Sequence, residues 1–177
     1  MFPLYPTTTP PTLAHRPFLH PLFQQLRHGL SEYSFANIYL FRQTHHYTFS
    51  RLNDGTIVIL GRDQDTPFFM LPFGVPELPM LNTLFRDHGM MKCVPKSMAT
   101  MLADTGFRVI EDRDNFDYLY RRQDLAELGG RNYHKKRNLI KAFLSSHPSY
   151  TARPLREEFR ADALRVLEDW GAATDQA

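Results

Sequence analysis

The stretch EDRDNFDYLYRRQDLAELGGRNYHKKRNLIKAF, residues 111–143, carries the densest pattern of the chain. Its first run, Phe116 to Tyr120, alternates as a strand does, and a short helical run follows up to the break at Gly129-Gly130. A basic helix is predicted after the two glycines. From Arg121 to Lys141 there are seven Lys or Arg and two acidic residues, a local charge of +5 against +2 for the whole chain. Such a concentration of cations is typical of surfaces that bind nucleic acid, phosphate or anionic lipid.

Six residues of this stretch are candidates for binding an anionic substrate: Arg122, Arg131, His134, Lys135, Lys136 and Arg137. The alternative is a solvated helix face without a ligand. Few acidic residues lie between these cations, so the cations repel one another. This repulsion slightly favours the interpretation that the segment binds an anion. Arg137 could instead pair with Asp117 and be structural. The side of the helix that carries Leu139, Ile140, Phe143 and Leu144 is predicted to be buried.

The amino-acid composition limits the classes of protein to which this chain can belong. The 177 residues suit one domain, or one domain and a fragment of a second, and 42% hydrophobic with 23% charged residues is a soluble globular profile. No apolar run approaches the roughly 20 residues of a membrane-spanning helix, and the N-terminus lacks a signal-peptide pattern. Cys93 is the only cysteine, so an intrachain disulfide is excluded. These features together predict a cytoplasmic protein.

Strands and helices are both predicted along the chain. Asn53-Asp54-Gly55 between two period-two runs is a hairpin signal, because Asp-Gly tolerates positive φ. The predicted strands are 47–52, 56–60, 67–71, 91–94, 107–111, 116–120 and 150–153. The predicted helices are 21–30, ended by Gly29, 31–41, capped by Ser31, 77–88, 95–105, the basic helix, and one from Pro154 to Trp170, ended by Gly171. The pattern indicates an α+β (mixed α/β) fold with a mostly antiparallel sheet flanked by helices.

Most of the usual chemical motifs are missing from the sequence. His45 and His46 are adjacent, so a strand would point them to opposite faces, and no set of residues has metal-ligand spacing. There is no phosphate-binding loop, nucleophile elbow or dinucleotide fingerprint. Cys93 lies in an apolar context and is interpreted as a buried, inert thiol. No metal and no catalytic residue is therefore predicted.

Three motifs in order resemble a known family. They are Phe116-Asp117-Tyr118 with Tyr120, then Asp124-Leu125-Ala126 with Leu128 and Gly129, then Lys135-Lys136-Arg137-Asn138 with Ile140 and Phe143. With SEYSFANIYLFR at 31–42 and LPFG at 71–74, the chain resembles the soluble family related to the C-terminal domain of phosphatidylglycerol lysyltransferase. The ordered match runs from about Pro21 to Trp170.

The resemblance implies two tandem acetyltransferase-like (GNAT) halves and, in better-known members, transfer of an aminoacyl group from aminoacyl-tRNA to a lipid. It implies a first GNAT-like domain at 21–153, and a linker helix and tail at 154–177. The prolines of residues 1–20 separately predict a loose or extended N-terminal arm. The second half, in which acyl transfer is expected, is absent from this sequence, so no catalytic residue carries over. The basic helix carries over as a contact for the tRNA acceptor end.

The residues alone are also compatible with two other functions. The chain could be a binding or structural module whose basic helix holds nucleic acid or a protein. It could also be a small acetyltransferase that uses acyl-coenzyme A, with Gly129-Gly130-Arg131 as the nearest approach to a pyrophosphate-binding turn. In each case the apolar stripe within 155–170, in the absence of a second half, predicts self-association through that helix.

Overall fold

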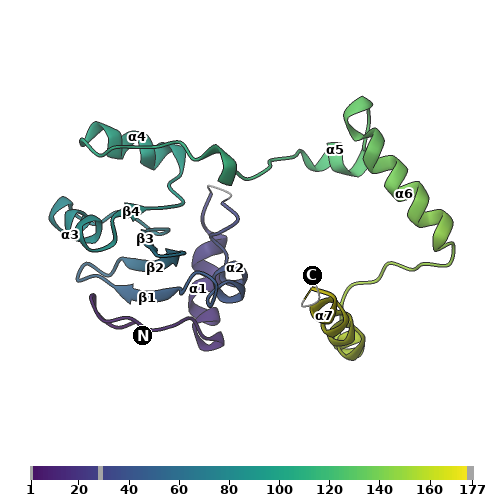
Figure 1. Cartoon of the computed structure of the whole chain (residues 1–177), viewed down its shortest axis with the longest axis horizontal. Helices are drawn as coiled ribbons and strands as arrows, with labels where there is room; N and C mark the ends of the chain where they lie inside the picture. Colours follow the sequence, from purple (N-terminus) through teal and green to yellow (C-terminus); the bar gives the residue numbers. More distant parts are fainter. Residues whose placement is uncertain (1, 28–29, 175–177) are drawn as a thin grey trace. The chain divides into compact units, whose positions relative to one another are not determined.

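A computed structural model describes residues 2–27 and 30–174. It divides into two compact units, of which the first ends at Tyr118 and the second begins at Leu119. The first unit contains α1 Arg16–Gln24, α2 Phe35–Leu40, β1 Thr48–Arg51, β2 Ile57–Asp63, β3 Thr66–Met70, α3 Leu78–His88, β4 Met90–Met91 and α4 Lys96–Asp104. The second contains α5 Arg122–Glu127, α6 His134–Ser146 and α7 Arg160–Thr174, with 3-10 helices at Arg131–Tyr133 and Glu157–Phe159 (Figure 1).

The first unit is built on a sheet with strand order β1-β2-β3-β4. β1 and β3 pair antiparallel to β2, whereas β4 pairs parallel to β3 over two residues. The predicted hairpin is confirmed, since Gly55 has a φ of +91° and Leu52 N donates to Thr56 O at 2.8 Å. The mixed α+β class with a mostly antiparallel sheet is confirmed and is consistent with a GNAT-like fold.

Both faces of this sheet are covered. Ile57 and Ile59 of β2 pack in one buried cluster with residues of α1 and α2, and Val58 and Leu60 pack in a second cluster with residues of α3 and α4. This double burial explains why β2 begins with a continuous apolar run and not with an alternating one. Figure 1 shows α3 and α1 on opposite sides of the strands.

The proline-rich N-terminal segment extends along β1. Thr9 and Phe49 exchange backbone hydrogen bonds at 3.0 and 2.8 Å, and Tyr5 N donates to Arg51 O at 3.0 Å. Phe2 is buried in the core cluster. The first helix begins at Arg16, upstream of the predicted start, with a proline in its first turn, where a missing N–H costs nothing. Gly29, predicted to end this helix, lies outside the described residues.

Three predicted strands are wrong: 107–111, 116–120 and 150–153 are not in any sheet. At 116–120 the expected alternation of buried faces is absent, and Leu119 is 98% exposed. The hydrogen bond from Phe116 N goes to Arg113 O inside a 3-10 turn, not to another strand. A period-two pattern indicates only a local tendency, whereas a strand also requires a neighbour that offers its backbone groups.

Several helix boundaries also differ from prediction, among them the start of α7, which lies at Arg160 and not at Pro154. α2 is capped by Ser34, whose side chain accepts from Asn37 N at 3.1 Å, while Ser31 N donates to the Asp117 carboxylate at 2.9 Å. α7 continues through Gly171 to Thr174, where a helix end was predicted. A glycine lowers helix propensity by about 1 kcal/mol but does not by itself end a helix.

Candidate phosphate-binding surface

The connection between α5 and α6 is organised by Arg137. α5 ends at Glu127, its C-cap residue Leu128 has a left-handed φ of 49°, and Gly130 has a φ of 78°. Arg137 Nη1 donates to Gly130 O at 2.8 Å and also to Leu128 O. One guanidinium nitrogen thus donates to two backbone carbonyls of the turn between α5 and α6. Arg137 is therefore a structural residue of the turn, bound to backbone carbonyl groups.

The other five candidate residues, Arg122, Arg131, His134, Lys135 and Lys136, are exposed. Within the part of the chain that the structure describes, none of them takes part in an ion pair. His134 Nε2 accepts a hydrogen bond from Asn138 Nδ2 at 3.2 Å. The structure therefore keeps the positive charges of Arg122, Arg131, Lys135 and Lys136 accessible to an anion in water.

The faces of α6 differ from the prediction in one respect. A helix of 3.6 residues per turn brings His134, Asn138 and Lys141 to one face, and Lys136 falls among Leu139, Ile140 and Phe143 on the opposite face. That apolar face was predicted to be buried, but its members are 41–65% exposed. The Phe143 ring stacks on that of His147, with centroids 4.7 Å apart, and meets the Tyr150 ring edge-on at 5.3 Å. Periodicity indicates an apolar face without indicating its partner.

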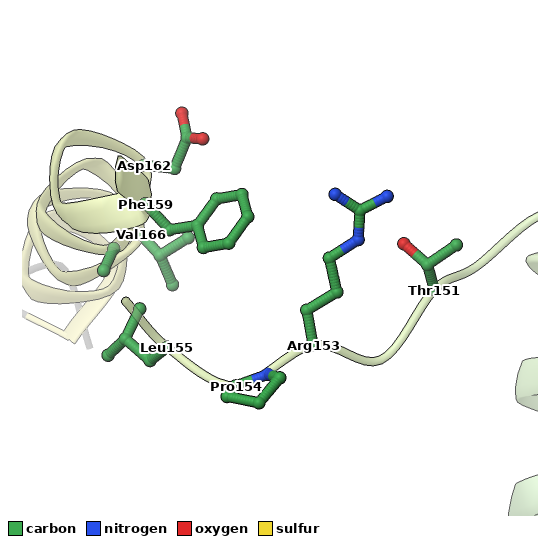
Figure 2. Close-up of a pocket in the computed structure, with 8 residues that line it drawn as sticks. Thr151, Arg153, Pro154, Leu155, Phe159, Asp162 and Val166 are labelled. Carbon is green, nitrogen blue, oxygen red and sulfur yellow. The ribbon is translucent and has the colours of Figure 1, made fainter. Parts of the chain in front are cut away.

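A shallow hollow of about 540 Å³ lies beside α7. It is lined by Thr151, Arg153, Pro154, Leu155, Phe159, Asp162, Ala163 and Val166. Figure 2 shows the Phe159 ring pointing from the helix toward the segment that carries Arg153. The Asp162 carboxylate already accepts from Arg165 at 2.6 Å. None of the six candidate anion-binding residues lines this hollow.

The first unit contains a polar cluster that the sequence did not indicate. Asp63, at the end of β2, accepts from His45 Nδ1 at 2.8 Å through one oxygen and from Lys92 Nζ through the other. Burial raises the pKa of Asp63, but the hydrogen bonds and charges of Lys92 and His45 outweigh it and hold that pKa below its ordinary value. The three residues are far apart in sequence, so no spacing rule could have joined them.

Metal and membrane features are absent from the described ranges, 2–27 and 30–174. No group of three or more His, Cys, Asp or Glu residues there is arranged to hold a metal ion. None of the helices there has the length and apolar character needed to cross a bilayer.

A mixed α+β domain followed by an exposed basic helix agrees with the class of acyl-transfer domains that the motifs resemble. The family model described as "Phosphatidylglycerol lysyltransferase, C-terminal" matches residues 23–177, and the chain belongs to this family. A crystal structure of a conserved protein of unknown function from Bacteroides thetaiotaomicron VPI-5482 is similar, with a TM-score of 0.74 and 25% identity.

The match with that structure covers 99% of this chain and 61% of that chain, so this sequence spans about three-fifths of its relative's length. No curated protein matches the chain.

Proposed function

We propose that the chain is part of an aminoacyltransferase related to the enzymes that use aminoacyl-tRNA, and that its basic surface binds the phosphates of the tRNA acceptor end. Family membership supports the reaction class. In this proposal, residues 21–153 form a first GNAT-like domain, 154–177 lead toward a second, and the second performs acyl transfer in the cytoplasm. The greater length of the similar solved chain is compatible with a second half.

One observation carries the RNA contact: the accessible cations Arg122, Arg131, Lys135 and Lys136, without ion-pair partners among the described residues. Unpaired cations on one short segment repel one another, and an anion relieves this repulsion. Phosphates of a nucleic acid satisfy this requirement in series, because each neutralised phosphate also releases condensed counterions. A single small anion would leave most of these charges without a partner.

The test is the salt dependence of binding to a single-stranded RNA with the acceptor-end sequence. For about four phosphate contacts, the slope of log affinity against log salt is expected near −3, at roughly −0.7 per contact. Replacing Lys135 and Lys136 by Ala should reduce the slope by about 1.4. Lys96→Ala is the matched control, since Lys96 is an exposed lysine of α4 outside the basic segment.

Three results would contradict this proposal. The first is the absence of measurable RNA binding, which leaves a structural or protein-binding module as the better interpretation. The second is an equal effect of Lys96→Ala and the double variant, which would show that binding follows only the overall charge. The third is binding of acyl-coenzyme A without any binding of RNA, which would favour a coenzyme-A-dependent acetyltransferase.

A further inference from the structure

Three segments of the first unit converge on the Asp63 carboxylate. His45 comes from the turn between α2 and β1, Asp63 from the end of β2, and Lys92 follows β4. Backbone hydrogen bonds fix the segments: Arg62 N donates to His45 O at 2.7 Å, and Lys92 N donates to Phe69 O at 2.9 Å. The cluster is therefore held in place by the sheet, as a preorganised site requires.

The backbone next to each member has an unusual conformation. His46, Gln64 and Cys93 directly follow the three cluster residues and have φ angles of 49°, 53° and 56°. Within the described ranges, the only other non-glycine residue with positive φ is Leu128. Left-handed conformations are unfavourable for residues with a Cβ, and they concentrate at functional sites. The β2–β3 turn alone does not explain why three residues with left-handed φ angles lie around one carboxylate.

Hydrogen bonding leaves one ring nitrogen of His45 available. With the pKa of Asp63 below its ordinary value, its carboxylate is ionised at neutral pH and only accepts hydrogen bonds. His45 Nδ1 therefore carries the proton that it donates to Asp63. In a neutral imidazole the other nitrogen, Nε2, then has a free lone pair and accepts from a ligand.

The cluster opens into a hollow of about 740 Å³, which is lined by Thr44, His45, Asp63, Gln64, Thr66, Met90, Lys92 and Asp112. Its charged groups are two carboxylates and one ammonium, and the ammonium of Lys92 is bound to Asp63. The second carboxylate, Asp112, accepts from the neutral amide of Asn115 at 2.8 Å and has no ion-pair partner among the described residues. The net charge is therefore negative, which disfavours phosphate and carboxylate ligands and favours a group that donates hydrogen bonds.

We propose that this hollow binds the protonated amine of a small ligand, with His45 Nε2 and the Asp112 carboxylate as its acceptors. Asp63 and Lys92 position the imidazole and do not contact the amine. The proposal is independent of the RNA contact, because all its residues belong to the first unit and the basic surface to the second.

The test is a titration of the ¹⁵N-labelled chain with alaninamide, followed by two-dimensional NMR. Saturable shifts of the Gln64 and Lys92 amides and of the His45 ring are expected at about millimolar concentration, as for a ligand of a few heavy atoms. N-acetylalaninamide, which lacks the cation, and inorganic phosphate should produce no saturable shift.

Asp112→Asn should weaken alaninamide binding at least fivefold and preserve the dispersion of the spectrum. Asp114→Asn is its matched control, because Asp114 lies in the same exposed connection but does not line the hollow. His45→Gln should also weaken binding, and its spectrum shows directly whether the fold is retained. Equal shifts with the acetylated compound, no saturable shift with alaninamide, or unchanged affinity in Asp112→Asn would each overturn the proposal.

Discussion

Cys93 shows how a single residue can be shielded by its surroundings. It follows β4 with a left-handed φ of 56°, and its carbonyl oxygen accepts from the Tyr33 hydroxyl at 2.8 Å. Its side chain packs against the core cluster that contains Phe23 and Tyr33. Burial raises the pKa of the Cys93 thiol from its ordinary value of 9.0 to about 12, and the charge of Glu32 acts in the same direction. Cys93 is half-buried and not fully buried as the sequence predicted, but the raised pKa of its thiol agrees with the predicted inertness.

We expect iodoacetamide to modify Cys93 slowly. The higher pKa lowers the thiolate fraction at pH 8 about a thousandfold. The greater nucleophilicity of a more basic thiolate compensates in part, which leaves a rate roughly 30- to 60-fold below that of an ordinary thiol, and burial slows it further. Mass spectrometry measures the rate, and the same chain unfolded in urea is the control. Equal rates for folded and unfolded chain would contradict the assigned burial.

At the scale of elements, the α5–α6 hairpin contains two kinds of cation. Arg137 is half-buried, and its side chain binds the carbonyls of Leu128 and Gly130. Lys135 and Lys136 precede it on the same helix and are exposed. The planar guanidinium bridges two carbonyls in a fixed geometry that a lysine ammonium does not reproduce. Stability and anion binding are therefore assigned to different residues of one helix.

Arg137→Ala should destabilise this hairpin by about 1–2 kcal/mol, since it leaves two carbonyls without a charged donor. Lys135→Ala and Lys136→Ala should change stability by no more than about 0.5 kcal/mol, because exposed substitutions away from special contacts cost little. Hydrogen exchange of the α6 amides measures the difference. If the α6 amides exchange at the same rate in Arg137→Ala and in Lys135→Ala, the structural role assigned to Arg137 is contradicted.

At the scale of the whole molecule, the two units differ in how they bury apolar surface. The first has two core clusters, one on each side of its sheet. Among residues 119–170 no side chain is buried. Large apolar side chains that stay exposed there include Leu139, Ile140, Phe143, Leu144, Tyr150, Leu155, Leu164, Val166, Leu167 and Trp170. Exposed apolar surface on this scale is typical of a region that binds another protein surface.

We therefore predict self-association through residues 155–170. Changing Val166 and Leu167 to Glu should raise the dissociation constant of the dimer at least tenfold, because burying each such side chain contributes about 1.5–3 kcal/mol. Glu168→Gln is the matched control on the same helix. Light scattering over a range of protein concentrations measures the equilibrium. A strictly monomeric chain at high concentration, with water-like Trp170 fluorescence, would contradict this prediction.

The sequence by itself predicted the local features of the fold. Asn53-Asp54-Gly55 indicated the hairpin because a turn depends on adjacent residues, and the Asp54 side chain indeed accepts from Thr56 N at 2.8 Å. The helix predicted at 77–88 ends at His88, and the following Gly89 has a φ of 74°, the left-handed conformation that glycine favours at a helix end. The ordered motifs between Phe116 and Phe143 indicated the family, and the family model matches residues 23–177.

Only the tertiary structure decided which distant groups meet. It showed that 116–120 lies outside the sheet, that Arg137 binds the carbonyls of a turn, and that His45, Asp63 and Lys92 share one site. Sequence patterns report the periodicity of one segment, which depends on its own backbone geometry. Strand pairing, burial of an apolar face and the partners of a charged group depend on segments elsewhere in the chain, and they become visible only when those segments are placed in space.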